Sequence, residues 1–321
     1  MNKKIIIFTG DPISINSEIL YKCWKKINNS TKKKIYIISN FNLLERQFIK
    51  LKYPIKLLKV KDIYQNSKDT RLKIIDINLK FKNVFKIPTA NSSKFIINSL
   101  NYAHRLAQNP DVSGMINCPI NKKLLNKANI GVTEYLASKS NIKDDSEVML
   151  IHNKIISVSP ITTHIDLRKV SKTISKEKII KKIKTIDKWF MKNLKIKPKI
   201  GMLGLNPHNA ELRVNSEENK IIIPAILNLK RFGIKITGPL VSDTIFINSY
   251  KKYDVLVGMY HDQILAPFKT MFKFNAINIT LGLKYLRVSP DHGVATDLIG
   301  KNKANSSSLL ECINFLNKYG K

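Results

Sequence analysis

Several features are scarce in this chain of 321 residues, and each narrows what the protein can be. It has only three cysteines, Cys23, Cys118 and Cys312, which are odd in number and far apart in the sequence. They form neither a disulfide framework nor a Cys-x-x-Cys metal site, so a reducing compartment fits best. No segment approaches the roughly 20 apolar residues of a membrane span. The first apolar run ends at Asp11, too early for a signal peptide, and no cleavage site follows it. We therefore expect a cytoplasmic protein without a membrane partner.

Acidic residues are also scarce, with 23 Asp and Glu against 56 Lys and Arg and a formal net charge of +33. Such a balance is the usual first hint of nucleic-acid binding. The lysines, however, are spread over nearly every segment and arginines are few. Groove-reading proteins concentrate arginine on one element, and single-strand binders place aromatic residues among the basic ones. We therefore expect solvated lysines and no nucleic-acid partner, with a field that attracts an anionic substrate.

Strand-like and helix-like patterns alternate along the chain. Short apolar runs such as residues 3–10 and 253–260 predict buried strands, and amphipathic stretches such as residues 17–27 and 93–109 predict helices. Residues 148–160 predict a hairpin. This alternation predicts α/β layers with a mostly parallel sheet, and the length of the chain favours two domains.

Three of the six histidines follow predicted strands: His164, His208 and His261. In an open α/β sheet, ligands bind beyond the carboxyl ends of the strands. Any one of these histidines could cap a strand or make a loop hydrogen bond. Together they could equally hold a divalent metal, because three imidazole ligands leave positions open for a substrate. The sequence leaves both interpretations open.

Two further groups of residues suggest ligand binding. Lys269, Asn278 and Arg287 would bind a phosphate or carboxylate if they converged on one pocket, with Arg287 supplying a bidentate fork. Taken singly, each could be an ordinary surface residue. The segment FTGDPIS (8–14) resembles a ligand loop, but the chain lacks the G-x-G-x-x-G of a dinucleotide-binding turn. An ordinary strand-to-helix turn explains it equally well.

Short motifs of this kind occur in a fixed order: TGDP (9–12), NCPINK (117–122), GVTE (131–134), TTH (162–164), GLNPH (204–208), SDTIF (242–246), GMYHDQ (258–263), NITLG (278–282) and RVSPDHG (287–293). On these motifs the chain resembles, over essentially its whole length, the family of 4-hydroxythreonine-4-phosphate dehydrogenase, the NAD-dependent enzyme of pyridoxal phosphate synthesis. The resemblance implies a fold similar to that of isocitrate and isopropylmalate dehydrogenases, with two α/β/α domains around a central cleft that holds the active site. Residues 1–135 with 281–321 would form the first domain, and residues 136–280 the second.

The resemblance also implies roles for individual residues. The ligands of a divalent metal (Zn, Mg, Mn or Co) would be His164, His208 and His261, in a homodimer whose metal site draws on both subunits. The substrate contacts would be Thr133, Lys269, Asn278 and Arg287. The residues near NAD or NADP would be Asp291, His292 and Gly293. By position alone, the candidates to orient metal ligands or relay a proton are Asp243 and Asp262.

The implied reaction is oxidation of the 3-hydroxyl group of 4-phosphohydroxy-L-threonine, followed by loss of CO2 to leave 3-amino-2-oxopropyl phosphate. A metal suits both steps because it stabilises negative charge that develops on oxygen. The family usually has a histidine where this chain has Val132. An alternative is therefore a related dehydrogenase that acts on 4-phosphothreonate or 4-phosphoerythronate. A second alternative, a non-catalytic nucleic-acid-binding protein on the same scaffold, is opposed by the three intact histidines.

Overall fold

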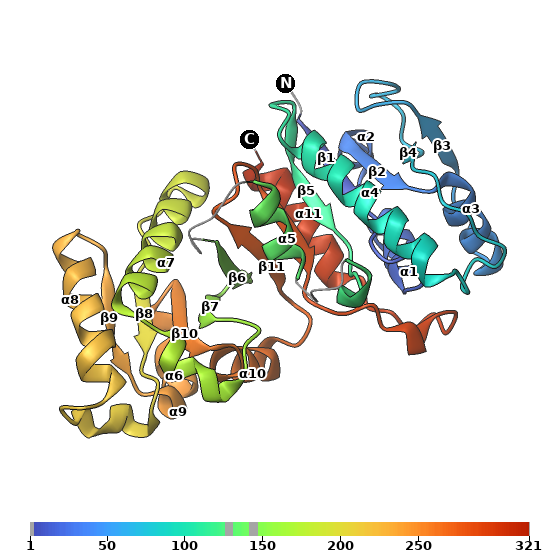
Figure 1. Cartoon of the computed structure of the whole chain (residues 1–321). Coiled ribbons are helices and arrows are strands. Elements are labelled where there is room, and N and C mark those ends of the chain that lie inside the picture. Colours follow the sequence, from blue (N-terminus) through green and yellow to red (C-terminus); the bar gives the residue numbers. More distant parts are fainter. Residues whose placement is uncertain (1–2, 126–130, 141–146, 321) are drawn as a thin grey trace. The chain divides into compact units, whose positions relative to one another are not determined.

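The computed structural model describes residues 3–125, 131–140 and 147–320 (Figure 1). The chain divides into two compact units, which are Met1–Leu136 with Lys284–Lys321 (unit 1) and Ala137–Leu283 (unit 2). Within the described ranges, no helix combines the length and the apolar character that crossing a membrane requires.

Unit 1 is built on a parallel sheet. Its strands lie in the order β3 (Leu57–Val60), β4 (Leu72–Asp76), β2 (Ile35–Ser39), β1 (Lys4–Phe8), β5 (Val112–Asn117) and β12 (Arg287–Pro290). Residues Ile5 to Phe8 of β1 are all fully buried, although successive side chains point to opposite faces of a strand. Both faces of this sheet are therefore covered, which explains why its strands appear in the sequence as continuous apolar runs.

Helices supply that cover. Helix α4 (Thr89–Ala107) packs against β1, β2 and β5, and α11 (Ser307–Tyr319) packs against β5 and β12. This unit also contains α1 (Asn16–Lys26), α2 (Asn29–Lys34), α3 (Phe41–Lys50) and the first part of α5 (Val132–Lys139). Two of them begin at an asparagine cap: the Asn28 side chain accepts from the backbone N of Thr31, and that of Asn40 from Leu43, both at 2.9 Å.

Unit 2 has a mixed sheet. Its strands lie in the order β11 (Ile277–Leu281), β6 (Val148–His152), β7 (Ser157–Thr162), β10 (Val255–Tyr260), β8 (Ile200–Leu203) and β9 (Ile236–Leu240). Strand β6 pairs antiparallel with β7 and β11, which confirms the predicted hairpin, and β7, β10, β8 and β9 are parallel. Its helices include α6 (Val170–Thr173), α7 (Lys176–Trp189), α8 (Ile223–Arg231), α9 (Ser242–Thr244) and α10 (His261–Phe272). The mixed α/β class and the mostly parallel pairing are as predicted.

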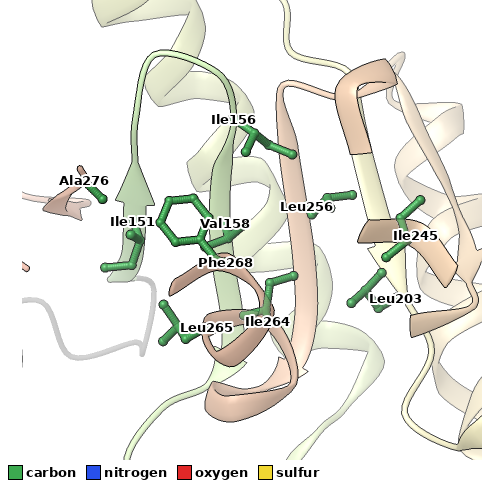
Figure 2. Close-up of a cluster of buried hydrophobic side chains, with 10 residues drawn as sticks. All are labelled: Ile151, Ile156, Val158, Leu203, Ile245, Leu256, Ile264, Leu265, Phe268 and Ala276. Atoms are coloured by element: carbon green, nitrogen blue, oxygen red, sulfur yellow. The ribbon is translucent and has the colours of Figure 1, made fainter. Parts of the chain in front are cut away.

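Helix α10 starts directly after β10, where the sequence pattern assigned no helix. Figure 2 shows how its apolar side chains Ile264, Leu265 and Phe268 lie against Val158 of β7 and Ile151 of β6 in one buried cluster. This packing fixes the first residues of α10 at the carboxyl end of β10.

Candidate functional site

The three histidines predicted as metal ligands follow three neighbouring parallel strands of unit 2. His164 comes two residues after β7, His261 is the first residue of α10 directly after β10, and His208 lies in a turn after β8. Because these strands are parallel and adjacent, their carboxyl ends form one edge of the sheet. The imidazole rings of His164 and His261 lie with their centroids 5.8 Å apart.

Asp262 orients the imidazole of His261. Its Oδ1 lies 2.7 Å from Nδ1 of His261. When a neutral imidazole donates from Nδ1 to such a carboxylate, its Nε2 lone pair can face a cation. The pair thus has the chemistry of a metal-binding imidazole with its supporting carboxylate.

Gln263 ties the loops at this edge together. Its Oε1 accepts from the backbone N of Met259 at 2.6 Å, and its Nε2 donates to the carbonyl of Gly204 at 2.7 Å and to Oγ of Ser242 at 2.9 Å. At the end of β10, the His-Asp-Gln sequence therefore supplies an imidazole, a carboxylate that contacts it and an amide that hydrogen-bonds the neighbouring loops.

The turn that carries His208 has an uncommon backbone. Five successive residues from His208 to Leu212 have positive φ values between 45° and 56°. L-residues hold such a conformation only where the surroundings impose it. Just before this run, the buried carboxylate of Glu218 holds the chain, because its Oε1 accepts from the backbone N of both Leu205 and Asn206 at 2.8 Å. Burial alone would raise the pKa of Glu218, but these hydrogen bonds hold its pKa below the usual value.

The described part of the chain does not by itself bring three metal ligands together. Within residues 3–125, 131–140 and 147–320, no three His, Cys, Asp or Glu side chains converge closely enough to hold a metal ion. The structure brings two of the predicted ligands, His164 and His261, into a pair. The donor set fits a divalent metal in its chemistry, because neutral imidazoles with a carboxylate behind one of them are common metal ligands.

Arg287 lies in unit 1, at the start of β12, and only 3% of it is exposed. Its Nε donates to Oδ1 of Asn117 at 2.5 Å, and its Nη1 to Oγ1 of Thr133 at 3.4 Å. Burial lowers the pKa of the guanidinium to about 10, so it still carries its charge at neutral pH. The structure therefore joins two of the predicted substrate residues, Arg287 and Thr133, and shows that Asn117, at the end of β5, holds the same guanidinium.

The other predicted substrate and proton-relay residues lie in unit 2. Lys269 is exposed on α10, and Asp243 is exposed at the start of α9. Asn278 lies on β11, and its buried Oδ1 has no hydrogen-bond partner among the described residues. A buried amide oxygen without a hydrogen-bond partner is unfavourable, and a ligand that donates a hydrogen bond to it would remove this cost.

The predicted cofactor residues lie in the loop after β12. The backbone N of Asp291 donates to Oγ of Ser308 at 2.9 Å, and Nδ1 of His292 faces the carbonyl of Gly293 at 3.0 Å. This loop touches the N-terminal loop, because the carbonyl of Val294 accepts from the backbone N of Ile15 at 3.2 Å.

The N-terminal loop itself links the carboxyl ends of β1 and β5. Gly10 has a φ of +73°, and a Cβ there would collide with the carbonyl of Pro119. The Nδ2 of Asn16 donates to that same carbonyl at 2.9 Å. Asp11 is buried inside the loop, where its Oδ1 accepts from the backbone N of Ile13 at 2.8 Å, and burial raises its pKa. The backbone of the TGDP motif thus lies directly against the backbone of the NCPI motif.

Comparisons with known proteins agree with this organisation. Residues 31–316 match the family described as "Pyridoxal phosphate biosynthetic protein PdxA". The chain is 39% identical over 325 residues to the 4-hydroxythreonine-4-phosphate dehydrogenase of Aquifex aeolicus, covering 98% of each chain. It is 37% identical to that of a Sulfurihydrogenibium species, covering 97% of this chain and 96% of the relative. The solved 4-hydroxythreonine-4-phosphate dehydrogenase of Klebsiella pneumoniae superimposes with a TM-score of 0.84 at 28% identity, over 99% of both chains.

The α/β fold and these relatives define an oxidoreductase of pyridoxal phosphate biosynthesis. The chain belongs to the PdxA family of pyridoxal phosphate biosynthesis.

Proposed function

We propose that this protein is a 4-hydroxythreonine-4-phosphate dehydrogenase. The reaction is oxidation of the 3-hydroxyl group of 4-phosphohydroxy-L-threonine, with decarboxylation to 3-amino-2-oxopropyl phosphate. The observation that carries the proposal is the arrangement of His164 and His261 at one sheet edge, with Asp262 behind His261. The activity named for relatives that match nearly the whole chain supports it.

The histidines would hold a divalent metal. A metal held there would stabilise negative charge on the substrate oxygen, and NAD bound beside it would serve as the hydride acceptor. Asp262 keeps Nε2 of His261 available as a ligand, and Gln263 holds the loops after β10 and β8 in register. Because no third ligand joins His164 and His261 among the described residues, we further propose that the site is completed in a homodimer that shares its ligands between subunits.

Arg287 would bind an anionic group of the substrate. It is charged and buried, and Asn117 fixes its Nε, so its direction is set before substrate arrives. A preorganised guanidinium binds phosphate or carboxylate more strongly than a mobile lysine because less side-chain freedom is lost. Thr133 is close enough to Nη1 of Arg287 to help position it. We assign Lys269 and Asn278 to substrate binding, and Asp291, His292 and Gly293 to the NAD side, by their place in the family motifs.

Val132 favours a second candidate substrate. It is the first residue of α5 and precedes Thr133, whose hydroxyl accepts from Arg287. A valine beside this group makes no polar contact with a substrate, which would suit 4-phosphothreonate or 4-phosphoerythronate in a refitted pocket.

The test is an NADH-absorbance assay on purified protein with these three phosphorylated hydroxy acids and a series of divalent metals. We expect NADH to form fastest with 4-phosphohydroxy-L-threonine and CO2 to be released with it. Faster turnover of 4-phosphothreonate would transfer the assignment to the second candidate. Absence of turnover with every substrate and metal would reject both.

A further inference from the structure

A basic pocket lies at the end of unit 2's strands opposite to the histidines. It has a volume of about 480 Å³ and is bordered by residues at the starts of β8 and β9 and just before β10. The lining residues are Lys199, Ile200, Lys230, Ile234, Lys235, Ile236, Thr237, Lys252 and Tyr253. Since the histidines follow the carboxyl ends of β8 and β10, this pocket is separate from the candidate metal site.

The rim of the pocket is strongly cationic. Four of its nine lining residues are lysines and none is acidic, whereas Lys and Arg together make up 56 of 321 residues in the whole chain. The density of cations here therefore exceeds the general lysine richness of the protein. Within the part of the chain that the structure describes, none of these four ammonium groups takes part in a salt bridge. The neighbouring carboxylate of Asp254 accepts from the backbone N of Lys199 at 2.7 Å.

The floor of the pocket is apolar. Ile200, Ile234 and Ile236 are 0%, 7% and 5% exposed, and the ring of Tyr253 lies beside them as a half-buried wall. Helix α8 ends at this place, and free carbonyls at a helix end would repel an anion. Here the turn after α8 uses them, because the backbone N of Phe232, Gly233 and Ile234 donate to the carbonyls of Asn228, Lys230 and Leu229.

We propose that this pocket binds a nucleoside polyphosphate. The four ammonium groups match the charge of a di- or triphosphate, and the half-buried ring of Tyr253, backed by the buried isoleucines, offers a surface for a flat base. The volume is within the range of small-molecule sites, which is roughly 300–1,000 Å³. The proposal does not depend on the dehydrogenase activity, because it uses none of the residues assigned to that site.

Calorimetric titration of the full-length protein with ATP, in chelator and without divalent metal, tests the proposal. The pocket variant is Lys199→Gln/Lys235→Gln/Lys252→Gln. The matched control is Lys172→Gln/Lys188→Gln/Lys192→Gln, which removes the same charge from exposed lysines of unit 2 outside the pocket. We expect one saturable site per chain, at least tenfold weaker binding in the pocket variant, and affinity within twofold of wild type in the control. Absence of saturable binding, or equal loss in both variants, would overturn the proposal.

A second titration separates the two parts of the ligand. Inorganic tripolyphosphate offers the charge without the ring, so we expect it to bind at least fivefold more weakly than ATP. If tripolyphosphate bound as tightly as ATP, the ring of Tyr253 would make no contact with a base and the nucleoside assignment would be wrong. Circular dichroism melting of the variants verifies that both triple substitutions leave the protein folded.

Discussion

Replacing Gln263 with leucine tests how the loops that carry the candidate ligands are held. The amide of Gln263 makes three hydrogen bonds, to Met259, Gly204 and Ser242, at 2.6–2.9 Å. Leucine is of similar size but makes none of them. At about 1 kcal/mol for each hydrogen bond, with a further cost where the Gly204 carbonyl stays unpaired, the free energy of unfolding of unit 2 should fall by roughly 3 kcal/mol.

For a unit of this size, a loss of about 3 kcal/mol lowers Tm by roughly 6–12 °C. Differential scanning calorimetry on the full chain measures it. The control is Gln108→Leu, which removes an exposed amide whose contacts are both to His104 and should change the unfolding free energy by no more than about 0.5 kcal/mol. If Gln263→Leu lowered Tm no further than this control, the bracing role of Gln263 would be refuted.

Three further predictions concern other parts of the molecule. Arg287→Ala should raise KM for the phosphorylated substrate about ten- to a hundredfold, because a charge-assisted contact contributes about 1.5–3 kcal/mol; an unchanged KM in a folded variant would remove Arg287 from the site. Val132→His should lower KM for 4-phosphohydroxy-L-threonine if that is the substrate, because an added hydrogen bond contributes about 0.5–1.5 kcal/mol of binding free energy. If the variant instead had a lower kcat/KM on this substrate, and wild type favoured 4-phosphothreonate, the second candidate would be supported. Burial lowers the pKa of Lys73 to about 8 from 10.5, so between these values the unfolded chain holds a proton that the folded chain has lost. In urea unfolding, the free energy of unfolding of wild type relative to Lys73→Met should therefore rise with pH across this window, by at most about 3 kcal/mol. A difference between the two proteins that stays constant or falls as pH rises would contradict the assignment.

The strands that position the histidines could be predicted from sequence. The apolar run that forms β10 ends visibly at His261, so the sequence alone placed this imidazole at a strand end. Helix α10 was missed, because Asp262 and Gln263 look like loop residues and Pro267 interrupts the helical pattern. The role of its apolar side chains Ile264, Leu265 and Phe268 follows from their packing on the sheet, which the local sequence does not indicate.

Strand β4 was hidden by a lysine. It lies in the lysine-rich stretch of residues 61–86, where no period could be recognised, and its second residue, Lys73, is fully buried. The ammonium of Lys73 donates to the carbonyls of Lys33 and Asp69 at 2.9 and 3.0 Å and lies 4.7 Å from the centre of the Tyr36 ring. A sequence pattern treats lysine as a surface residue, so a lysine that is buried against carbonyls and an aromatic ring goes unrecognised.

The partners of the site residues could not be predicted at all. Arg287 meets Asn117 across 170 positions, and Gln263 meets Gly204 across 59. Both Asn117 and Gln263 stand inside motifs that mark the family, but nothing in the local pattern says which atom each contacts. Glu218, which accepts from the backbone of Leu205 and Asn206 just before the turn of His208, carries no sequence signal, because an isolated glutamate usually indicates a solvated surface.

Metal titration of the histidine variants tests the central claim most directly. Metal-free protein is titrated with Zn²⁺ by calorimetry for wild type, His164→Ala, His208→Ala, His261→Ala and the control His152→Gln, whose ring contacts Ser157 in the β6–β7 hairpin. We predict tight binding by wild type and control, and at least a tenfold loss of affinity in each of the other three, with parallel loss of NADH formation. The account would be contradicted if His208→Ala bound Zn²⁺ as tightly as wild type and kept full activity in the presence of chelator.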